Sequence, residues 1–195
     1  MNKNDLRFIK TEENIVASFL KILEKEDFSV ITITEICQLA RCSRNTFYLH
    51  YQTKDELMNN IVNEVLLHLS DELDNRVTNI GQIDFQVTDL YIKGIIESVK
   101  KDLNTLKILV LKDLGQFRNQ YADTINKTFI KNAGKISEKS NTEEYYLITA
   151  YLSHAITGFI FYWIQSSNLT LEEAEVVLLK QHSAAIEASL YFLKN

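Results

Sequence analysis

Residues 31–57 read ITITEICQLARCSRNTFYLHYQTKDEL, and this stretch decides the fold. Thr32 with Glu35, and Thr53 with Glu56, have the spacing of helix capping boxes, and Ser43 stands where it can cap a helix between them. The first two starts predict short helices joined by a tight turn, and the third opens a long helix that carries the chain onward through Leu57, Ile61, Val65 and Leu69. Together with an amphipathic helix before them, they predict a compact N-terminal unit.

The helix that follows Ser43 carries rings on more than one side. A step of about 100° per residue places Phe47 and Tyr51 on one face and Asn45 and Leu49 on the opposite face. We therefore expect the two rings to be core and the other pair to be exposed. Three further residues border the exposed strip, namely Thr46, Tyr48 and His50.

A strip of this composition suits the major groove of DNA. Asn45 and Arg44 offer forked hydrogen-bonding groups to purine edges, and Leu49 can contact a thymine methyl group. The hydroxyl and imidazole groups beside them suit phosphate oxygens. Lys54 opens the next helix, where a cation is unfavourable against the helix dipole, so a bound phosphate is the better explanation for it.

The distribution of charge along the sequence also favours a contact between this region and DNA. The formal net charge of −5 argues mildly against a nucleic-acid partner. However, residues 36–54 contain no Asp or Glu, while Arg41, Arg44 and Lys54 lie within them. The local charge therefore favours DNA, although the total does not.

Composition predicts an all-α protein with one or two domains. The 195 residues include no Pro and only five Gly, and 46% of them are hydrophobic. No apolar run approaches the roughly 18 residues that a membrane span needs, and the first residues lack the apolar core of a signal peptide. We therefore expect a cytoplasmic protein without a membrane partner.

Helical periodicity continues through the rest of the chain. Beyond a first helix at 5–24 and the three capped ones, helices are expected at 84–100, 103–116, 121–132, 143–165 and 171–193. A turn at 79–81 and the polar loop GKISEKSN at 134–141 separate some of them, and Thr170 with Glu173 gives the last helix a further capping box. The last two helices hold small residues that allow close helix packing, namely Ala155, Gly158, Ala174, Ala184, Ala185 and Ala188.

The run at 31–57 resembles the helix-turn-helix of the TetR (tetracycline repressor-like) family of transcriptional regulators. Its pattern is approximately I-T-x-x-x-I-A-x-x-A-G-V-S-x-x-T-F-Y-x-x-F-x-x-K-x-x-L. The matching positions are Thr32, Ile36, Ala40, Ser43, Thr46, Phe47, Tyr48, Lys54 and Leu57. The departures are Cys37, Arg41, Cys42 and Tyr51, of which Arg41 must accept a turn conformation that Gly takes without strain. The first helix and the S-R-N-T-F-Y-x-H-Y run resemble the branch that includes dihydroxyacetone-kinase-operon regulators.

The resemblance implies a helix-turn-helix head at 1–54 and a helical effector-binding and dimerisation body at 55–195. It also implies an Ω-shaped homodimer that pairs through the helices at 143–165 and 171–193 and reads a palindromic operator. The most direct function is that of a repressor released by a small molecule. The residues expected at the DNA are Thr32, Thr34, Arg41, Ser43, Arg44, Asn45, Thr46, Tyr48, Leu49, His50 and Lys54.

The body is rich in aromatic residues, which would suit an apolar or aromatic effector. The candidate pocket residues are Tyr91, Phe117, Tyr121, Tyr151, His154 and Phe159. An ordinary hydrophobic core explains the same residues equally well and is the preferred interpretation, with His154 as a hydrogen-bonded core group. An alternative is that the body binds a partner protein, as in relatives that act as co-activators.

No other chemistry is indicated by the sequence. Cys37 and Cys42 do not have a metal-ligand spacing and are expected to be small core residues. The sequence has no Gly-rich phosphate loop, nucleophile elbow or metal-ligand pattern, so we expect neither an enzyme, a cofactor nor a metal.

Overall fold

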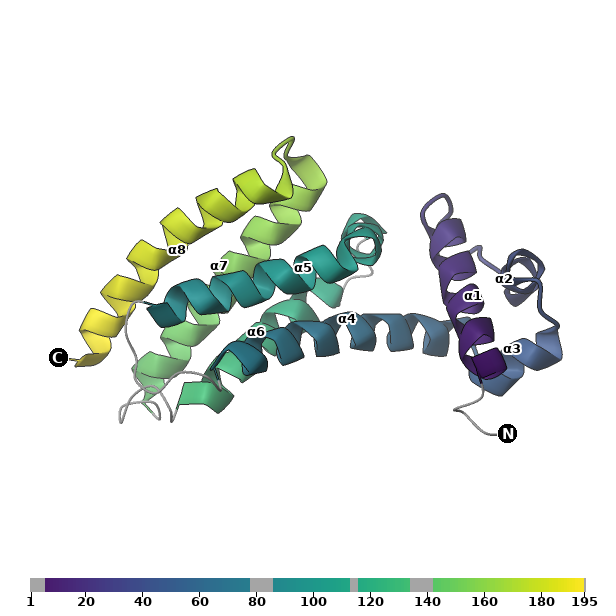
Figure 1. Ribbon diagram of the computed structural model, residues 1–195, viewed down its shortest axis with the longest axis horizontal. Coiled ribbons are helices and arrows are strands. Elements are labelled where there is room, and N and C mark those ends of the chain that lie inside the picture. Colours follow the sequence, from purple (N-terminus) through teal and green to yellow (C-terminus); the bar gives the residue numbers. More distant parts are fainter. Residues whose placement is uncertain (1–5, 78–85, 113–115, 134–141, 195) are drawn as a thin grey trace. The chain divides into compact units, whose positions relative to one another are not determined.

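The computed structural model describes residues 6–77, 86–112, 116–133 and 142–194, and all regular secondary structure in these ranges is helical (Figure 1). The prediction of an all-α protein is confirmed. The helices are α1 (Leu6–Leu23), α2 (Ile33–Ala40), α3 (Arg44–His50), α4 (Lys54–Val77), α5 (Gln86–Lys112), α6 (Phe117–Ala133), α7 (Glu143–Ser166) and α8 (Leu171–Lys194).

The chain forms two compact units, Met1–Glu64 and Val65–Asn195. The division between these units falls within α4, whereas the boundary after residue 54 between a DNA-binding and an effector-binding domain stays a prediction. The early turns of α4 bury Leu57 and Ile61, and this part of the helix belongs with the first unit. A capping box marks where a helix begins, but it does not mark where a unit ends.

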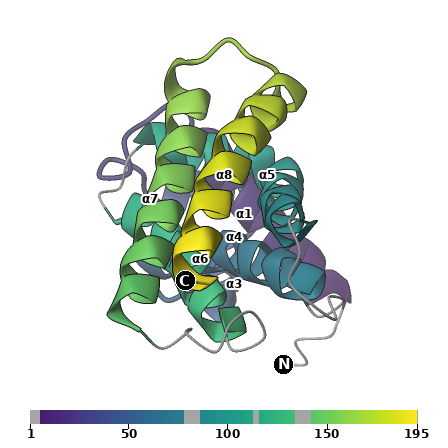
Figure 2. The ribbon, with the colours of Figure 1, turned by 90° about the vertical axis from the view of Figure 1, so that its left-hand side faces the viewer.

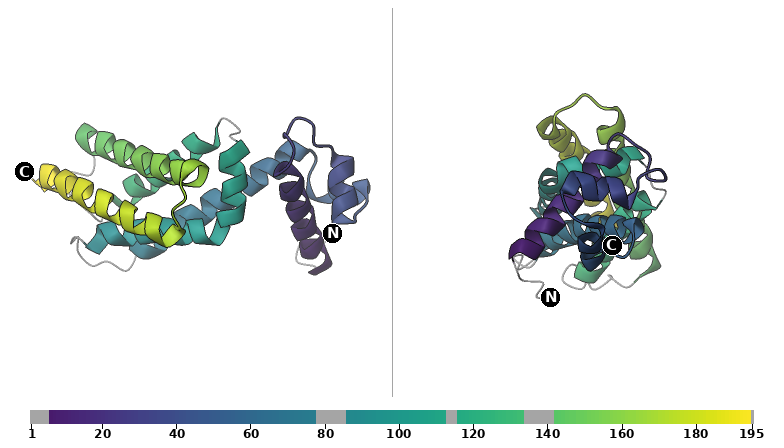
Figure 3. Two further views of the ribbon diagram at one scale, coloured as in Figure 1. Left: turned by 90° about the horizontal axis from the view of Figure 1, so that it is seen from above. Right: turned by 90° about the vertical axis from the view of Figure 1, so that its right-hand side faces the viewer.

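The first unit, which we call the head, is organised by an apolar stripe along α1. Phe8, Ile15, Phe19 and Leu23 are buried and recur at helical spacing on one face of the helix. Helix α1 packs against α2, which in turn packs against α3. The right-hand view in Figure 3 shows α1, α2 and α3 of the head.

The second unit, which we call the body, begins with a bent helix. The sequence predicted two helices at 84–100 and 103–116, whereas the structure has one, α5, with non-helical dihedrals at Asp102 (φ −109°, ψ 15°). The Asp102 carboxylate lies 2.9 Å from Nδ1 of His68 on α4. The predicted break is therefore real but appears as a kink. The predicted turn at 79–81 and the loop at 134–141 lie outside the described residues.

Helices α7 and α8 lie side by side on one face of the body (Figure 2). Thr142 caps α7 by accepting a hydrogen bond from Tyr145 N–H, and Thr170 and Glu173 form the expected reciprocal box at the start of α8. The ends of both helices agree with the predicted ranges to within one residue. Helix α6 begins earlier than predicted, at Phe117.

Helix α7 corrects one expectation from the sequence. Its length and apolar composition would allow it to cross a membrane, and 44% of the relevant 18-residue window is buried within the protein. One such helix is weak evidence for a span, because core helices of soluble proteins have the same length and apolar composition. However, Leu147, Tyr151 and Tyr162 are 72%, 67% and 67% exposed, which leaves an apolar stripe of α7 without a partner in its own unit.

Candidate nucleic-acid interface

Helix α2 is fixed at both ends by its own sequence. At its start Thr32 Oγ1 accepts a hydrogen bond from Glu35 N–H, and the Glu35 carboxylate accepts one from Thr32 N–H, as the capping-box spacing predicted. The Thr32 hydroxyl and then the Thr32 N–H donate to the Glu35 carboxylate, and these two hydrogen bonds hold the pKa of Glu35 below its usual range. At its end Arg41 adopts a left-handed conformation (φ 54°), and Cys42 N–H donates to Cys37 O at 3.0 Å. The turn into α3 is therefore sharp, and Arg41 fills the place that Gly takes in the family pattern.

Helix α3 is positioned by one cap and two rings. Ser43 Oγ accepts a hydrogen bond from Thr46 N–H at 3.0 Å, as predicted. Phe47 and Tyr51 are buried, 0% and 3% exposed, which confirms that this face of the helix is core. The Tyr51 hydroxyl donates to Glu12 Oε1 on α1 at 3.0 Å, and burial raises the pKa of Tyr51. These contacts fix both the position and the rotation of a very short helix.

The opposite face of α3 is open to solvent, as predicted. Asn45 is exposed and Leu49 is 57% exposed. Arg44 Nη2 donates to the Tyr48 hydroxyl at 3.3 Å, so these two side chains meet on one flank of the strip. We call this surface the recognition strip and define it as Arg44, Asn45, Tyr48 and Leu49. It offers two forked hydrogen-bonding groups and an apolar tip, which can read base edges in a major groove, and beside them a hydroxyl that suits phosphate.

Several other residues expected at the DNA have a local structural role. The hydroxyls of Thr32 and Ser43 cap α2 and α3, and Thr46 Oγ1 lies 2.8 Å from Ser43 Oγ. Thr34 is exposed in the first turn of α2. Contacts of these residues with phosphate remain predictions. The free N–H groups in the first turn of each helix would take part in the same contacts.

The explanation of Lys54 by a bound phosphate is wrong in this structure. Lys54 Nζ donates to the carbonyl oxygens of Phe28, Ser29 and Ile31 at 2.7, 3.1 and 2.8 Å, and it lies 4.7 Å from the centre of the Phe28 ring. An ammonium group has three donors, so all of them are used within the head. Lys54 therefore ties the loop after α1 to the start of α4.

His50 also lies elsewhere than the sequence suggested. Its ring stacks on Phe8 of α1 with 3.8 Å between centroids, and both ring nitrogens are buried without a hydrogen-bond partner among the described residues. Burial lowers the pKa of His50, so the neutral ring is favoured. His50 is therefore a packing residue in this structure and does not present an N–H group to phosphate. Extending the stripe of α1 back from Ile15 to Phe8 would have shown that Phe8 belongs to the core face, although not that His50 lies against it.

The candidate effector residues do not form one group. Phe117 and Tyr121 are buried and form an aromatic cluster with Phe161, whereas Tyr91 is buried against Phe129. Phe159 is half-buried.

Two of these candidates lie on the surface, which corrects their placement in a pocket or core. Tyr151 is 67% exposed, and His154 is exposed with its Nδ1 2.9 Å from Ala150 O. Within the described residues no group of three or more His, Cys, Asp or Glu is placed to hold a metal ion. Cys37 is buried, as expected of a small core residue, and burial beside Cys42 raises its pKa to about 11.

Sequence comparison finds one curated relative and no family. No protein-family model matches the chain. Seventy residues are 36% identical to YxbF of Bacillus subtilis strain 168, which is named as an uncharacterised HTH-type transcriptional regulator. The match covers 35% of this chain and only 18% of that protein. It therefore supports similarity over part of the chain.

Solved structures match over nearly the whole chain. A TetR-family regulator from Syntrophomonas wolfei has a TM-score of 0.70 at 15% identity, covering 91% of this chain and 96% of its own. A TetR regulator from Streptococcus agalactiae 2603V has a TM-score of 0.63 at 20% identity over the same shares of both chains. The dihydroxyacetone kinase operon activator DhaS has a TM-score of 0.60 at 19% identity, covering 95% and 97%. The chain therefore has the fold of the TetR-family transcriptional regulators.

Proposed function

We propose that this chain is a sequence-specific DNA-binding transcriptional regulator that acts in the cytoplasm as a homodimer. The observation that carries the proposal is the recognition strip, which α3 presents outward while Phe47 and Tyr51 lock the other face into the head. A helix of this length reads few base pairs by itself, and two copies related by a two-fold axis would read a palindrome. The proteins named above are regulators, which agrees with the expectation that the chain is not an enzyme.

DNA selected from a random pool by the full chain tests this function. We expect a palindromic consensus, with Asn45→Ala and Arg44→Ala changing which bases are preferred, because these side chains would meet base edges. Tyr48→Phe should weaken binding to all sites about equally, since a hydroxyl on phosphate carries no sequence information. Lys25→Ala is the control, because Lys25 is exposed in the head outside the strip. An unchanged consensus with both Asn45→Ala and Arg44→Ala would refute the assignment.

The proposed dimer face is the apolar stripe of α7. Leu147, Tyr151 and Tyr162 are exposed along it, and a Cβ built at Gly158 meets no atom within 4 Å. Exposed apolar side chains in register along one helix face are typical of a surface that another protein covers. On α8 the exposed residues Val176, Val177 and Ala184 extend the apolar surface, whereas Ala174 is buried within its own body and is not available for the contact.

Gly158 allows a sharp test of this face. Gly158→Leu has room within the subunit, so the monomer should fold, but the added side chain should obstruct a close helix pair. Gly158→Ala is the matched control, and it should favour the helix by roughly 0.5–1 kcal/mol. We expect sedimentation to give a dimer for the wild type and for Gly158→Ala, and a monomer for Gly158→Leu. A dimer in all three would refute this face, and co-sedimentation of the wild type with lipid vesicles would favour a membrane instead.

The body has two candidate modes of regulation. We propose repression relieved by a small apolar effector that would contact the buried aromatic cluster of Phe117, Tyr121 and Phe161. The alternative is a partner protein bound to the body, favoured by the exposed stripe of α7 and by the structural neighbour that is named an activator. Copurification of a stoichiometric partner would favour the second, and release from operator DNA by a metabolite extract freed of protein would favour the first.

A further inference from the structure

A groove between α1 and α2 in the head has no part in the recognition strip. It consists of two hollows that share Leu39, one of about 480 Å³ and one of about 390 Å³. Along α1 the larger hollow is lined from Asn14 to Lys21, and the smaller one is lined by Ile22 near the end of α1 and by Glu26 in the turn that follows. The two hollows therefore follow one another along α1, with Leu39 between them.

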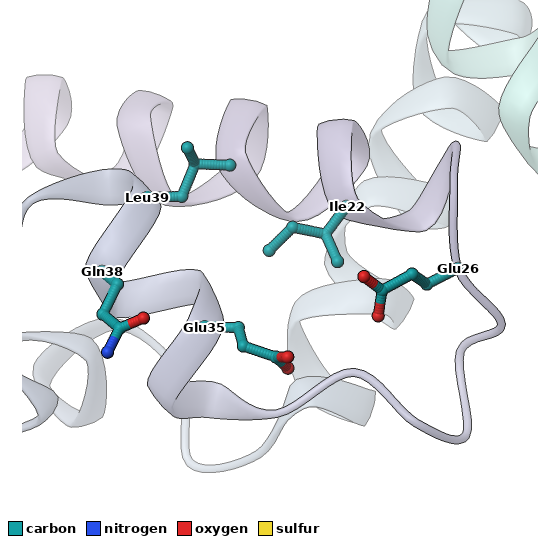
Figure 4. A pocket seen from close by; sticks show the side chains of 5 residues that line it. All are labelled: Ile22, Glu26, Glu35, Gln38 and Leu39. Atoms are coloured by element: carbon teal, nitrogen blue, oxygen red, sulfur yellow. The ribbon is translucent and has the colours of Figure 1, made fainter.

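The two ends of this groove carry opposite charge. Lys21 and Arg41 line the larger hollow, and no carboxylate lines it. Glu26 and Glu35 line the smaller one, and Figure 4 shows their carboxylates turned toward one another, with Leu39 pointing from α2 toward α1. Leu39 is 43% exposed although it stands on the side of α2 that faces α1. The groove is thus positive, apolar and negative in that order.

We propose that this groove binds the same groove of a second copy of the chain. A two-fold axis that lies in the contact plane and crosses the groove at Leu39 exchanges its two ends. The same rotation places α1 of one copy against α1 of the other, so Lys21 of one copy faces Glu26 of the other, Arg41 faces Glu35, and Leu39 meets its own counterpart. A peptide with charges of one sign would complement only one end, which is why a second copy is the better occupant.

The contact joins heads of different molecules and does not depend on the face of α7. Exposed ion pairs contribute little individually and are screened by salt, so free molecules should associate weakly. Two heads held on neighbouring DNA sites would have a high effective concentration, which turns a weak contact into cooperative binding.

Sedimentation of the full chain over a concentration series, at about 0.02 M and about 0.5 M salt, tests the proposal. At low salt the wild type should form a larger species that dissociates at high salt. Lys21→Glu and Glu26→Lys should each weaken this association about tenfold. A chain that carries both changes should recover it, because the exchange restores opposite charges across the two-fold axis. Circular dichroism checks that every variant keeps its helices.

Three results would overturn the proposal. The first is the absence of any salt-sensitive association in the wild type. The second is an effect of Lys21→Glu but not of Glu26→Lys, which would indicate an acidic partner at one end of the groove. The third is a double variant that remains as weak as the single ones. Association that persists in Gly158→Leu separates this contact from the proposed dimer face.

Discussion

Replacing Lys54 by Met separates a structural role of this residue from a phosphate contact. Met keeps an apolar stem of similar reach and removes the ammonium group. The carbonyl oxygens of Phe28 and Ile31, both partly buried, then lose donors at 2.7 and 2.8 Å, and the contact of the ammonium with the Phe28 ring disappears. Water can replace the donor at Ser29, whose hydrogen bond is exposed.

The size of the effect follows from these contacts. An unsatisfied, partly buried carbonyl costs about 1 kcal/mol, and an exposed cation–π contact adds about 0.5–1 kcal/mol. We therefore expect the free energy of unfolding of the head to fall by about 2–3 kcal/mol. For a unit of this size that is a decrease in Tm of roughly 10–20 °C.

Hydrogen exchange followed by mass spectrometry measures the free energy of unfolding of the head by itself, because peptides from α1 and from the start of α4 report on the head. The only tryptophan, Trp163, lies in α7, so its fluorescence reports on the body as an internal control. Lys25→Met is the matched variant, since Lys25 is exposed in the same loop. The reasoning is refuted if Lys54→Met leaves head exchange unchanged while the slope of log K against log salt for DNA binding falls by about one, which is the signature of a lost phosphate contact.

Three further changes in the head have predicted directions. Arg41→Gly should stabilise the head by about 1 kcal/mol, because a left-handed residue at φ 54° is strained with a side chain, and a higher denaturation midpoint would show it. Tyr51→Phe should cost about 1 kcal/mol through the hydrogen bond lost to Glu12, measured in the same way, and an unchanged midpoint would argue that water replaces the hydroxyl. Burial lowers the pKa of His50 in the folded head below its value in the unfolded chain. The contribution of His50 to stability is therefore fully present above the unfolded pKa and is lost as the pH falls through the folded pKa. His50→Phe, which keeps the stacking on Phe8, should therefore reduce the loss of head stability between neutral pH and pH of about 5, and an unaltered pH profile would contradict the assignment.

The sequence predicted the features of the head that local spacing determines. A capping box is a relation between residues three apart, and the boxes at Thr32 and Thr170 are present as expected. The rotation of α3 follows from helical geometry alone, so the burial of Phe47 and the exposure of Leu49 were predictable. Each of these features can be predicted from a few residues that are close together in the sequence.

The sequence did not predict contacts between residues far apart in the chain. Lys54 reaches carbonyl groups 23 to 26 residues before it, and no local pattern shows that a loop will bring them there. His50 was placed by its angle on α3, and that angle did not reveal that the start of α1 would cover it. On α7 apolar residues lie on most sides of the helix, so periodicity could not separate the exposed Tyr151 from the buried Leu152.

The inward position of Lys54 changes how an acidic chain can bind DNA. Of the three cations in residues 36–54, only Arg41 and Arg44 remain exposed. Glu35 and Glu56 border this window, and their carboxylates bind backbone N–H groups as helix caps. With so few charges to attract phosphates, the affinity of the proposed DNA contact would depend more on free N–H groups at the helix starts and on the proposed base contacts of Asn45 and Leu49. Such a head would bind DNA of random sequence weakly, because nonspecific affinity comes mainly from charge, and it would therefore need a second head on a palindromic site.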